Sequence, residues 1–495
     1  DFCSIDGAML DAATDDAVHI YKSSNIQRFV DGTWSANNLV DNVWGHYYEG
    51  IRAANFYLKE TAGLTFDEWK YSDDYEAIMK EFTNYQYEVR FLRAYFYFEL
   101  IKRYRNIPFV LDVLAQNEAN GVNPESYEKI AKFIVDECSD LAQILPVNYD
   151  NFSTKEKGRV TRAAAMALKS RVTLYMASPL FSEDSEDKWK QAAEAAYDII
   201  KQKTDLGLDL VPYPQIFNDV NNQKAEVILY RPTGESGDFE KANFPIGVEG
   251  GKTSTCPTQN LMEAYDMKDG TPFVWNNQSN PYDNRDPRMK YTIVCNEMKW
   301  PVDPVEIWEG GTNGLPLQNA TTTGYYLKKY VNNTISFEAG STVTKKQHNW
   351  VLFRYGEILL NYAEAMINAF HDPNYKDAVY NMSAREAVNQ IRGRTNISLP
   401  GFPSDITEKD FVKRLKNERR VELAFEGHRF WDVRRWKELG QTANIYGVKI
   451  TKNNEVISYE KFLLETRAVT DNMYFYPIPN TERFKNPNLG QNPGW

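Results

Sequence analysis

The chain is poor in the residues that build metal and redox sites. Its 495 residues include only four cysteines, at positions 3, 138, 256 and 295, and five histidines. No two cysteines form a CxxC pair, so the spacing of a structural zinc site is absent, and we expect neither a metal nor a cofactor. Cys138 falls in the apolar pattern of a helix and is expected in the core. A disulfide between Cys256 and Cys295 stays open, because the sequence cannot establish it.

Long apolar stretches and basic stretches are also missing. No run of about 18 apolar residues occurs, and the mean hydropathy is −0.57, so the sequence predicts no transmembrane helix. The formal net charge is −11 at pH 7, without a run of Lys and Arg to offset it locally. An acidic surface repels phosphate backbones, which argues against nucleic acid as a partner.

Short catalytic signatures are missing as well. In GVEGGKT, at 247–253, the first glycine stands one residue too close to the GK pair for a phosphate-binding loop. GESGD, at 234–238, does not fit GxSxG, and HExxH does not occur. The sequence therefore predicts no enzyme of a class that carries a short local motif.

The densest charged segment, NERRVELAFEGHRFWDVRRW at 417–436, admits two interpretations. Glu418, Glu422 and Glu426 recur every four residues and would share one face of a helix. Two of these carboxylates could act as the acid and base of a glycosidase. Arginines could instead pair with them and lock two helices together. We favour the structural interpretation, because ion pairs that hold a fold far outnumber catalytic pairs.

Helical periodicity predicts a mostly helical body in two parts, about 41–203 and 353–440. Small alanines recur at helical spacing in RAAAMALKSRV and LLNYAEAMINA, which favours helix pairs stacked as in tetratricopeptide arrays, although no strict period is visible. Caps, glycines and prolines set the expected helix bounds, and Thr407 with Asp410 makes a capping-box-like start at 407. These bounds are about 41–63, 80–104, 125–145, 161–177, 187–203, 353–370, 383–393, 407–425 and 428–438.

The stretch from about 205 to 350 has a different character. Gly, Pro, Asn and Thr become frequent, and VILYRP, MKYTIV and GYYLKKYV are typical of short strands. We expect a loop-rich insert in the helical body, and such regions usually carry function. Residues 441–495 are expected to form a C-terminal tail, and residues 1–495 a single domain.

Aromatic residues make up 14% of the chain, with 31 Tyr and 11 Trp. A sugar ring has an apolar C–H face and a rim of hydroxyls, so a glycan binder needs a flat aromatic side chain with polar neighbours. Burial in the core is the commoner fate of any single large aromatic residue. Several aromatics in polar loops are nevertheless expected to bind glycan: Trp69, Tyr71, Trp275, Tyr282, Trp300 and Trp34.

Several segments together resemble the SusD/RagB family. They follow the family's order over nearly the whole chain, although Arg105 and Asn106 stand where the family usually has Gly. The segments are VRFLRAYFYFELIKRYRNIPFV, GRVTRAAAMALKSRVTLYMASP, NRDPRMKYTIV, FRYGEILLNYAEAMI, NERRVELAFEGHRFWDVRRW and the closing NPNLGQNPGW.

The resemblance implies a mostly α fold with four tetratricopeptide-like units that pack on a SusC-like, TonB-dependent transporter. It implies non-catalytic binding of an oligosaccharide or polysaccharide, and delivery of that glycan to the transporter. It also implies a lipidated Cys that anchors the protein to the extracellular face of the outer membrane. Cys3 lacks a lipobox context, so we expect the anchor in a segment before Asp1.

Two other functions remain open at this point. The protein could be a scaffold or lid that caps the transporter and takes peptide or another nutrient. It could also be a glycoside hydrolase, because the carboxylates of such enzymes lack a short motif.

Overall fold

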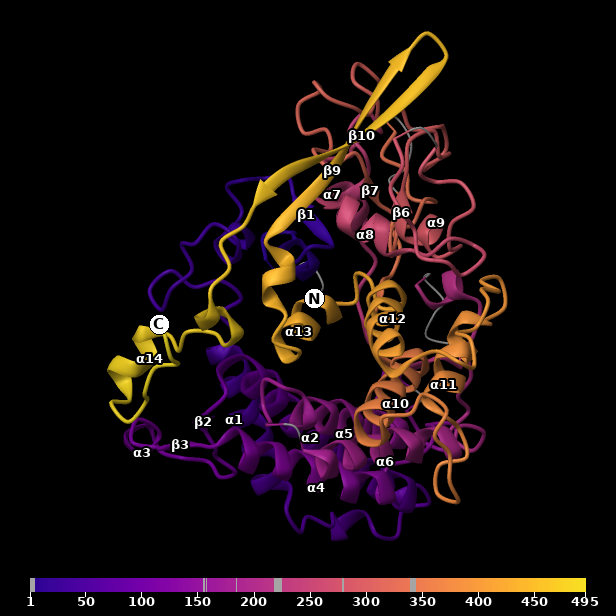
Figure 1. Ribbon diagram of the computed structural model, residues 1–495. Coiled ribbons are helices and arrows are strands. Elements are labelled where there is room, and N and C mark those ends of the chain that lie inside the picture. The colour runs from indigo at the N-terminus through magenta and orange to yellow at the C-terminus, as the bar shows by residue number, and fades with distance from the viewer. Residues whose placement is uncertain are drawn as a thin grey trace. The chain divides into compact units, whose positions relative to one another are not determined.

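The computed structural model describes residues 5–154, 156, 158–183, 185–217, 225–277, 280–338 and 344–495. The chain folds as two compact units. Unit 1 comprises Asp1–Trp34 and Leu210–Thr470, and unit 2 comprises Ser35–Asp209 and Asp471–Trp495. Helices dominate both units (Figure 1), which confirms the predicted mostly helical fold.

Unit 2 is a stack of long helices in which α1 packs on α2, α2 on α4, α4 on α5 and α5 on α6. Alanines of α5 and α6, among them Ala164 and Ala193, are fully buried. Such small side chains let neighbouring helices approach closely, as the alanine spacing predicts. The five helices are α1 (Trp44–Thr61), α2 (Tyr75–Tyr104), α4 (Tyr127–Ile144), α5 (Arg162–Ala177) and α6 (Glu186–Lys201).

The ends of these helices follow local signals. Helix α1 ends two residues before Gly63, which has a φ of 75°. Helix α2 begins earlier than predicted and ends where Arg105 adopts a φ of 66°, shortly before Pro108. Strands β2 and β3 of unit 2 pair antiparallel. The shorter elements are η3 (Asp67–Trp69), β2 (Ile107–Pro108), α3 (Gln116–Ala119), β3 (Pro124–Glu125), η7 (Asp471–Tyr474) and α14 (Asn480–Lys485).

Unit 1 has a helical part in which α10 (Tyr355–Phe370) packs against α11 (Ala384–Arg392) and α12 (Glu408–Glu422), and α13 (His428–Arg435) follows. The Thr407 hydroxyl accepts the backbone N–H of Asp410 at 3.2 Å and caps α12, as predicted. Helix α12 stops short of the expected bound because Phe425 and Gly427 adopt left-handed φ angles of 59° and 73°. No helix in the described ranges of either unit is long and apolar enough to cross a membrane.

Short antiparallel strand pairs make up much of the rest of unit 1. Strand β1 (Ala17–His19) pairs with β5 (Thr255–Pro257), and β4 (Val227–Pro232) pairs with β8 (Asn349–Arg354). Strand β6 (Ile293–Val294) pairs with β7 (Tyr326–Leu327). The long hairpin of β9 (Asn444–Asn453) and β10 (Val456–Thr466), yellow-orange in Figure 1, was not identified from the sequence. The remaining elements are η1 (Leu10–Ala13), η2 (Asn25–Phe29), η4 (Tyr213–Ile216), α7 (Asp238–Asn243), α8 (Gln259–Ala264), α9 (Met289–Thr292) and η6 (Leu439–Thr442).

Two predicted strands of unit 1 are shorter than expected. The first four residues of MKYTIV form helix α9 instead. A carboxylate oxygen of Asp286 accepts the backbone N–H of Arg288 at 2.9 Å, which starts a helical turn. Only Tyr326 and Leu327 of GYYLKKYV form a strand, because the chain soon leaves extended geometry at Tyr330, where φ is 67°.

The possible disulfide between Cys256 and Cys295 is not formed. Both are free, buried thiols, and burial raises the pKa of each to about 12. Cys138 is buried in α4, as predicted, whereas Cys3 lies outside the described residues. In the described part of the chain, no cluster of three or more His, Cys, Asp or Glu side chains could hold a metal ion.

Candidate ligand-binding sites

An aromatic platform lies in the loop between α1 and α2 of unit 2, and we call Phe66 and Trp69 the Trp69 platform. Their rings stack, with centroids 5.7 Å apart and planes 19° apart. Phe66 in turn packs edge-on against Phe82 of α2, at 4.8 Å. Trp69 is 51% exposed. One face of the indole therefore rests on a ring anchored to α2, while much of the side chain faces solvent.

The loop backbone fixes the position of this platform. Phe66 has a φ of 47°, a left-handed conformation that is unusual for a bulky residue. Its carbonyl accepts the backbone N–H of Trp69 at 2.8 Å, and the carbonyl of Trp69 accepts that of Ser72 at 2.8 Å. Successive turns thus hold the indole in place, although no long element runs through the loop.

Tyr71 adds a second exposed ring to the same loop. It is 88% exposed, and the ammonium of Lys70 lies 5.0 Å from its ring centroid. The carboxylates of Asp67, Glu68 and Asp73 are exposed on the same stretch. An exposed ring can stack on the apolar face of a sugar, and the polar groups around it can form hydrogen bonds with the hydroxyls at the rim.

Trp275 of unit 1 lies beside a large pocket, which has a volume of about 840 Å³. Its half-buried ring meets Phe273 edge-on at 6.4 Å, and its indole N–H donates to the side-chain oxygen of Asn277. Phe273 lines the pocket and carries the guanidinium of Arg285 3.7 Å from its ring centroid. Trp275 thus lies next to a cavity rather than within it.

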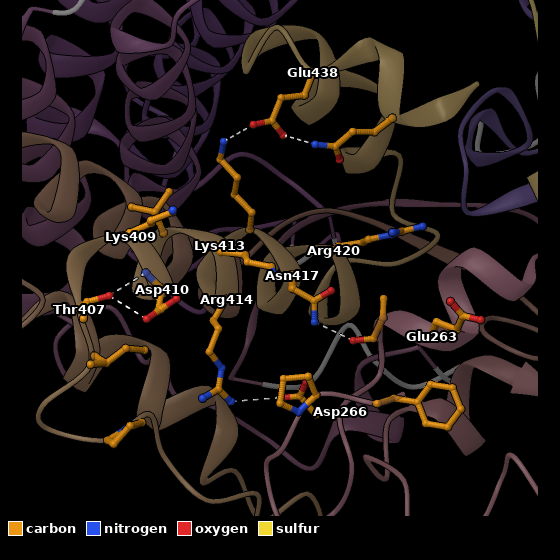
Figure 2. A pocket seen from close by; sticks show the side chains of 18 of the residues that line it. Glu263, Asp266, Thr407, Lys409, Asp410, Lys413, Arg414, Asn417, Arg420 and Glu438 are labelled. Atoms are coloured by element: carbon orange, nitrogen blue, oxygen red, sulfur yellow. Dashed lines mark hydrogen bonds and ion pairs between the residues drawn. The ribbon is translucent and has the colours of Figure 1, made fainter. Parts of the chain in front are cut away.

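Charged side chains make up much of the lining of this large pocket, and Figure 2 shows the side chains of α12 along it. Arg414 lies 3.3 Å from the carboxylate of Asp266, and Asn417 donates to the Ala264 carbonyl at 2.7 Å. Many of its cations are thus already paired within the protein. Its charged lining residues are Glu263, Asp266, Asp405, Lys409, Asp410, Lys413, Arg414, Lys416, Arg420, Arg429 and Glu438.

The other three predicted site residues, all in unit 1, differ in accessibility. Trp34 is only 4% exposed and packs edge-on against Phe29 at 4.7 Å, so it offers no ring face to a ligand, and we leave it out of the proposed sites. Tyr282 is half-buried, with Tyr459 edge-on at 5.3 Å. Trp300 is 7% exposed but lines a separate pocket of about 390 Å³.

The predicted residues therefore form one group in unit 2 and are dispersed in unit 1. Trp69 and Tyr71 belong to unit 2, and the other four belong to unit 1. The sequence analysis missed Phe66, although it stands three residues before Trp69 in the same loop. It also did not single out Lys328, which lines the same pocket as Trp300 and falls in a segment that we assigned to a strand.

The glutamates at 418, 422 and 426 form a buried ion-pair network, which confirms the structural interpretation of this segment. Glu422 lies 2.6 Å from Arg394 and 2.8 Å from both Arg354 and Arg288. These arginines lie outside the 417–436 segment, so the segment alone does not contain the partners of Glu422. Burial alone would raise the pKa of Glu422, but Arg394 and Arg354 hold it far below its ordinary value.

Comparison with known proteins agrees with this architecture. The SusD family model matches residues 216–495, and a model described as "Starch-binding associating with outer membrane" matches residues 6–174. The chain belongs to the SusD family. It is 23% identical over 481 residues to SusD-like protein P2 of Formosa agariphila, covering 93% of this chain and 81% of that protein.

Two solved structures of the family, both from Bacteroides fragilis, are similar over nearly the whole chain. A SusD-like protein superposes with a TM-score of 0.79 at 26% identity, covering 98% of this chain and 93% of the other. A SusD-like carbohydrate-binding protein superposes with a TM-score of 0.79 at 25% identity, covering 97% and 92%. The similarity thus spans both units.

Proposed function

We propose that this protein binds an oligosaccharide or polysaccharide at the outer membrane, without catalysis, and delivers it to a SusC-like transporter. The Trp69 platform carries the proposal. Its half-exposed indole is backed by Phe66 and surrounded by polar side chains, and this is the arrangement that a sugar ring requires. A ring already held in place loses little entropy when a ligand stacks on it.

Family membership supports the same function. One solved relative is named a carbohydrate-binding protein, and the description of the matching N-terminal model refers to starch binding and the outer membrane. We further propose that a lipid anchor holds the protein on the extracellular face of the outer membrane. Binding at the surface would concentrate glycan beside the transporter.

The non-catalytic part of the proposal rests on the engaged carboxylates. Glu418 and Glu422 are buried and paired with arginines, and Glu426 pairs with Arg354 and Lys329. A carboxylate held by two cations is a poor proton donor or acceptor for a substrate. The conspicuous charged segment therefore supports the fold rather than a reaction.

Affinity electrophoresis through gels that contain polysaccharides tests the proposal. We expect a polysaccharide to retard the wild type, and Trp69→Ala to weaken that binding about tenfold, because a stacked ring contributes about 0.5–1.5 kcal/mol beyond its buried area. Tyr71→Ala should weaken it less. Phe484→Ala is the matched control, because Phe484 of α14 in the same unit is 84% exposed and outside the loop.

Three results would count against this proposal. Unchanged binding in both Trp69→Ala and Tyr71→Ala would remove the platform as the site. New reducing ends after incubation with the bound glycan would indicate a hydrolase. Failure to bind any glycan, with intact binding of peptide or of the transporter, would favour a scaffold or lid.

A further inference from the structure

The pocket that Trp300 lines, here the Trp300 pocket, presents positive charge only. No Asp or Glu side chain lines it in the ranges that the structure describes, although the chain carries a net charge of −11. A volume of about 390 Å³ is within the usual range for small-ligand sites. Its lining residues are Pro214, Phe217, Tyr291, Trp300, Lys328, Lys329, Tyr330, Val331, Asn332, Asn333, Thr334, Lys346 and His348.

Two of these basic residues pair with carboxylates that do not line the pocket. Lys329 donates to Glu426 at 2.9 Å, and His348 lies 2.9 Å from the carboxylate of Glu240. Glu240 and Glu426 are buried and do not line the cavity. The carboxylates of Glu426 and Glu240 are therefore already paired with Lys329 and His348.

Lys328 differs from these two residues. Its ammonium lies 3.6 Å from the sulfur of Met298 and 4.8 Å from the ring centroid of Trp300, and it meets no carboxylate in the described part of the chain. Burial lowers the pKa of Lys328, and the nearby cation Lys290 lowers it further. A half-buried cation without a counter-ion is costly, so such an arrangement favours a site that an anion completes.

Trp300 also carries a buried polar group without a partner in the described ranges. Its indole N–H is buried and finds no acceptor among the residues that the structure describes. Tryptophan N–H groups usually have a partner when they are buried. This N–H is closed off from solvent, so it is the missing counter-charge of Lys328 that distinguishes an anionic ligand from an apolar one.

We propose that the Trp300 pocket binds an acidic sugar residue, one that carries a carboxylate or a sulfate ester. The inference rests on the proposed glycan-binding function and narrows its substrate to anionic glycans. Lys328 supplies the counter-charge, and the half-buried ring of Tyr291 in the same lining suits the face of the sugar ring.

Matched pairs of polysaccharides test the inference and separate the two sources of charge. Polygalacturonate is compared with its fully methyl-esterified form, and κ-carrageenan with its desulfated form. We expect the wild type to bind at least one charged member at least tenfold more tightly than its neutral counterpart. The pair that shows the difference identifies the carboxylate or the sulfate as the recognised group.

Variants of Lys328 then locate the binding. Lys328→Met should weaken binding of the charged polysaccharide at least tenfold, and Lys328→Arg should retain most of it. Lys452→Met is the matched control, because the ammonium of Lys452 lies 4.4 Å from the ring centroid of Trp308 in the same unit, outside the pocket. A melting temperature for each variant confirms that it folds.

Failure of the inference is distinguishable from failure of the proposed function. Equal binding to charged and neutral members, binding to neutral glycans alone, or an unchanged affinity in Lys328→Met overturns the acidic-sugar site. Neutral binding that Trp69→Ala abolishes would leave the proposed function intact. Absence of binding to every glycan of either class would remove both.

Discussion

The ring of Phe66 lies stacked against the ring of Trp69, with 5.7 Å between their centroids and 19° between their planes. Phe66 thus supports one face of an exposed indole. We therefore expect Phe66→Ala to weaken glycan binding about threefold to tenfold, even though Phe66 acts through Trp69. The expected loss is about 1 kcal/mol, the typical contribution of an aromatic pair.

Affinity electrophoresis measures this effect, with Phe66→Leu as the partner variant. Leucine preserves apolar volume against Phe82 but removes the flat ring, so its affinity should lie between those of Phe66→Ala and the wild type. Wild-type affinity in Phe66→Ala would show that Trp69 needs no support from Phe66. The stacking of the two rings would then not contribute to binding.

A second prediction concerns the buried ion-pair network of unit 1. Glu422 is surrounded by Arg288, Arg354 and Arg394 at 2.6–2.8 Å and is fully buried. Glu422→Gln removes one negative charge and leaves three buried guanidinium groups less compensated. We expect the free energy of unfolding to fall by about 3–5 kcal/mol, as when one partner of a buried pair is lost.

Chemical denaturation measures this change, and Glu309→Gln is the matched control. Glu309 forms an ion pair with Lys449 at 3.2 Å in the same unit, but about half of each side chain is exposed. Solvent screens such a pair, so the same substitution should cost less than about 1 kcal/mol. Equal effects at the two positions would show that the buried network adds no more stability than a surface pair.

A third prediction concerns the dependence of stability on pH. Burial, together with the nearby carboxylate of Asp16, raises the pKa of Asp11 from 3.8 to about 7. A carboxyl with a raised pKa in the folded state disfavours folding once the unfolded chain ionises. The cost appears above pH 3.8, grows as the pH rises, and is complete above about pH 7.

Asp11→Asn should therefore stabilise the protein more at pH 8 than at pH 5. Asparagine keeps a side-chain oxygen to accept the backbone N–H of Phe425, which lies 3.2 Å from the carboxylate. The gain is at most about 4 kcal/mol, since a tenfold change in proton affinity is worth about 1.4 kcal/mol. Denaturation curves at both pH values measure it, and a gain independent of pH would contradict the assignment.

Local features of the chain were predicted well where local chemistry decides them. Strand β4 has the predicted bounds, and the Thr407 cap starts α12 as expected. The partners of Glu422 could not be predicted in the same way. Arg354 and Arg288 stand 68 and 134 residues away along the chain, and only the tertiary fold brings them together.

The candidate aromatic residues illustrate the same limit. Trp34 and Trp69 both occur among polar residues, yet Trp34 is buried and Trp69 is half exposed. Sequence spacing does not distinguish them, because exposure depends on contacts such as that of Trp34 with Phe29. The Trp300 pocket could not be predicted from the sequence either, because only the tertiary fold determines that no described acidic side chain lines the pocket around Lys328.

A last prediction compares two glycines that occupy the second residue of a helix, Gly356 in α10 and Gly45 in α1. A Cβ atom at Gly356 would lie 2.9 Å from the carboxylate of Glu226 and would also meet the guanidinium of Arg354. A Cβ atom at Gly45 would meet nothing within 4 Å. The buried network thus leaves no room for a side chain at Gly356, whereas the start of α1 does.

We expect Gly356→Ala to lower the free energy of unfolding by about 1–3 kcal/mol, the usual cost of overpacking a core. Gly45→Ala should change it little or raise it by up to about 1 kcal/mol, because alanine favours helix more than glycine does. Denaturation of both variants at neutral pH makes the comparison. If Gly356→Ala is as stable as Gly45→Ala, the ion-pair network around Arg354 is loose enough to accommodate a methyl group, and the predicted overpacking at Gly356 is wrong.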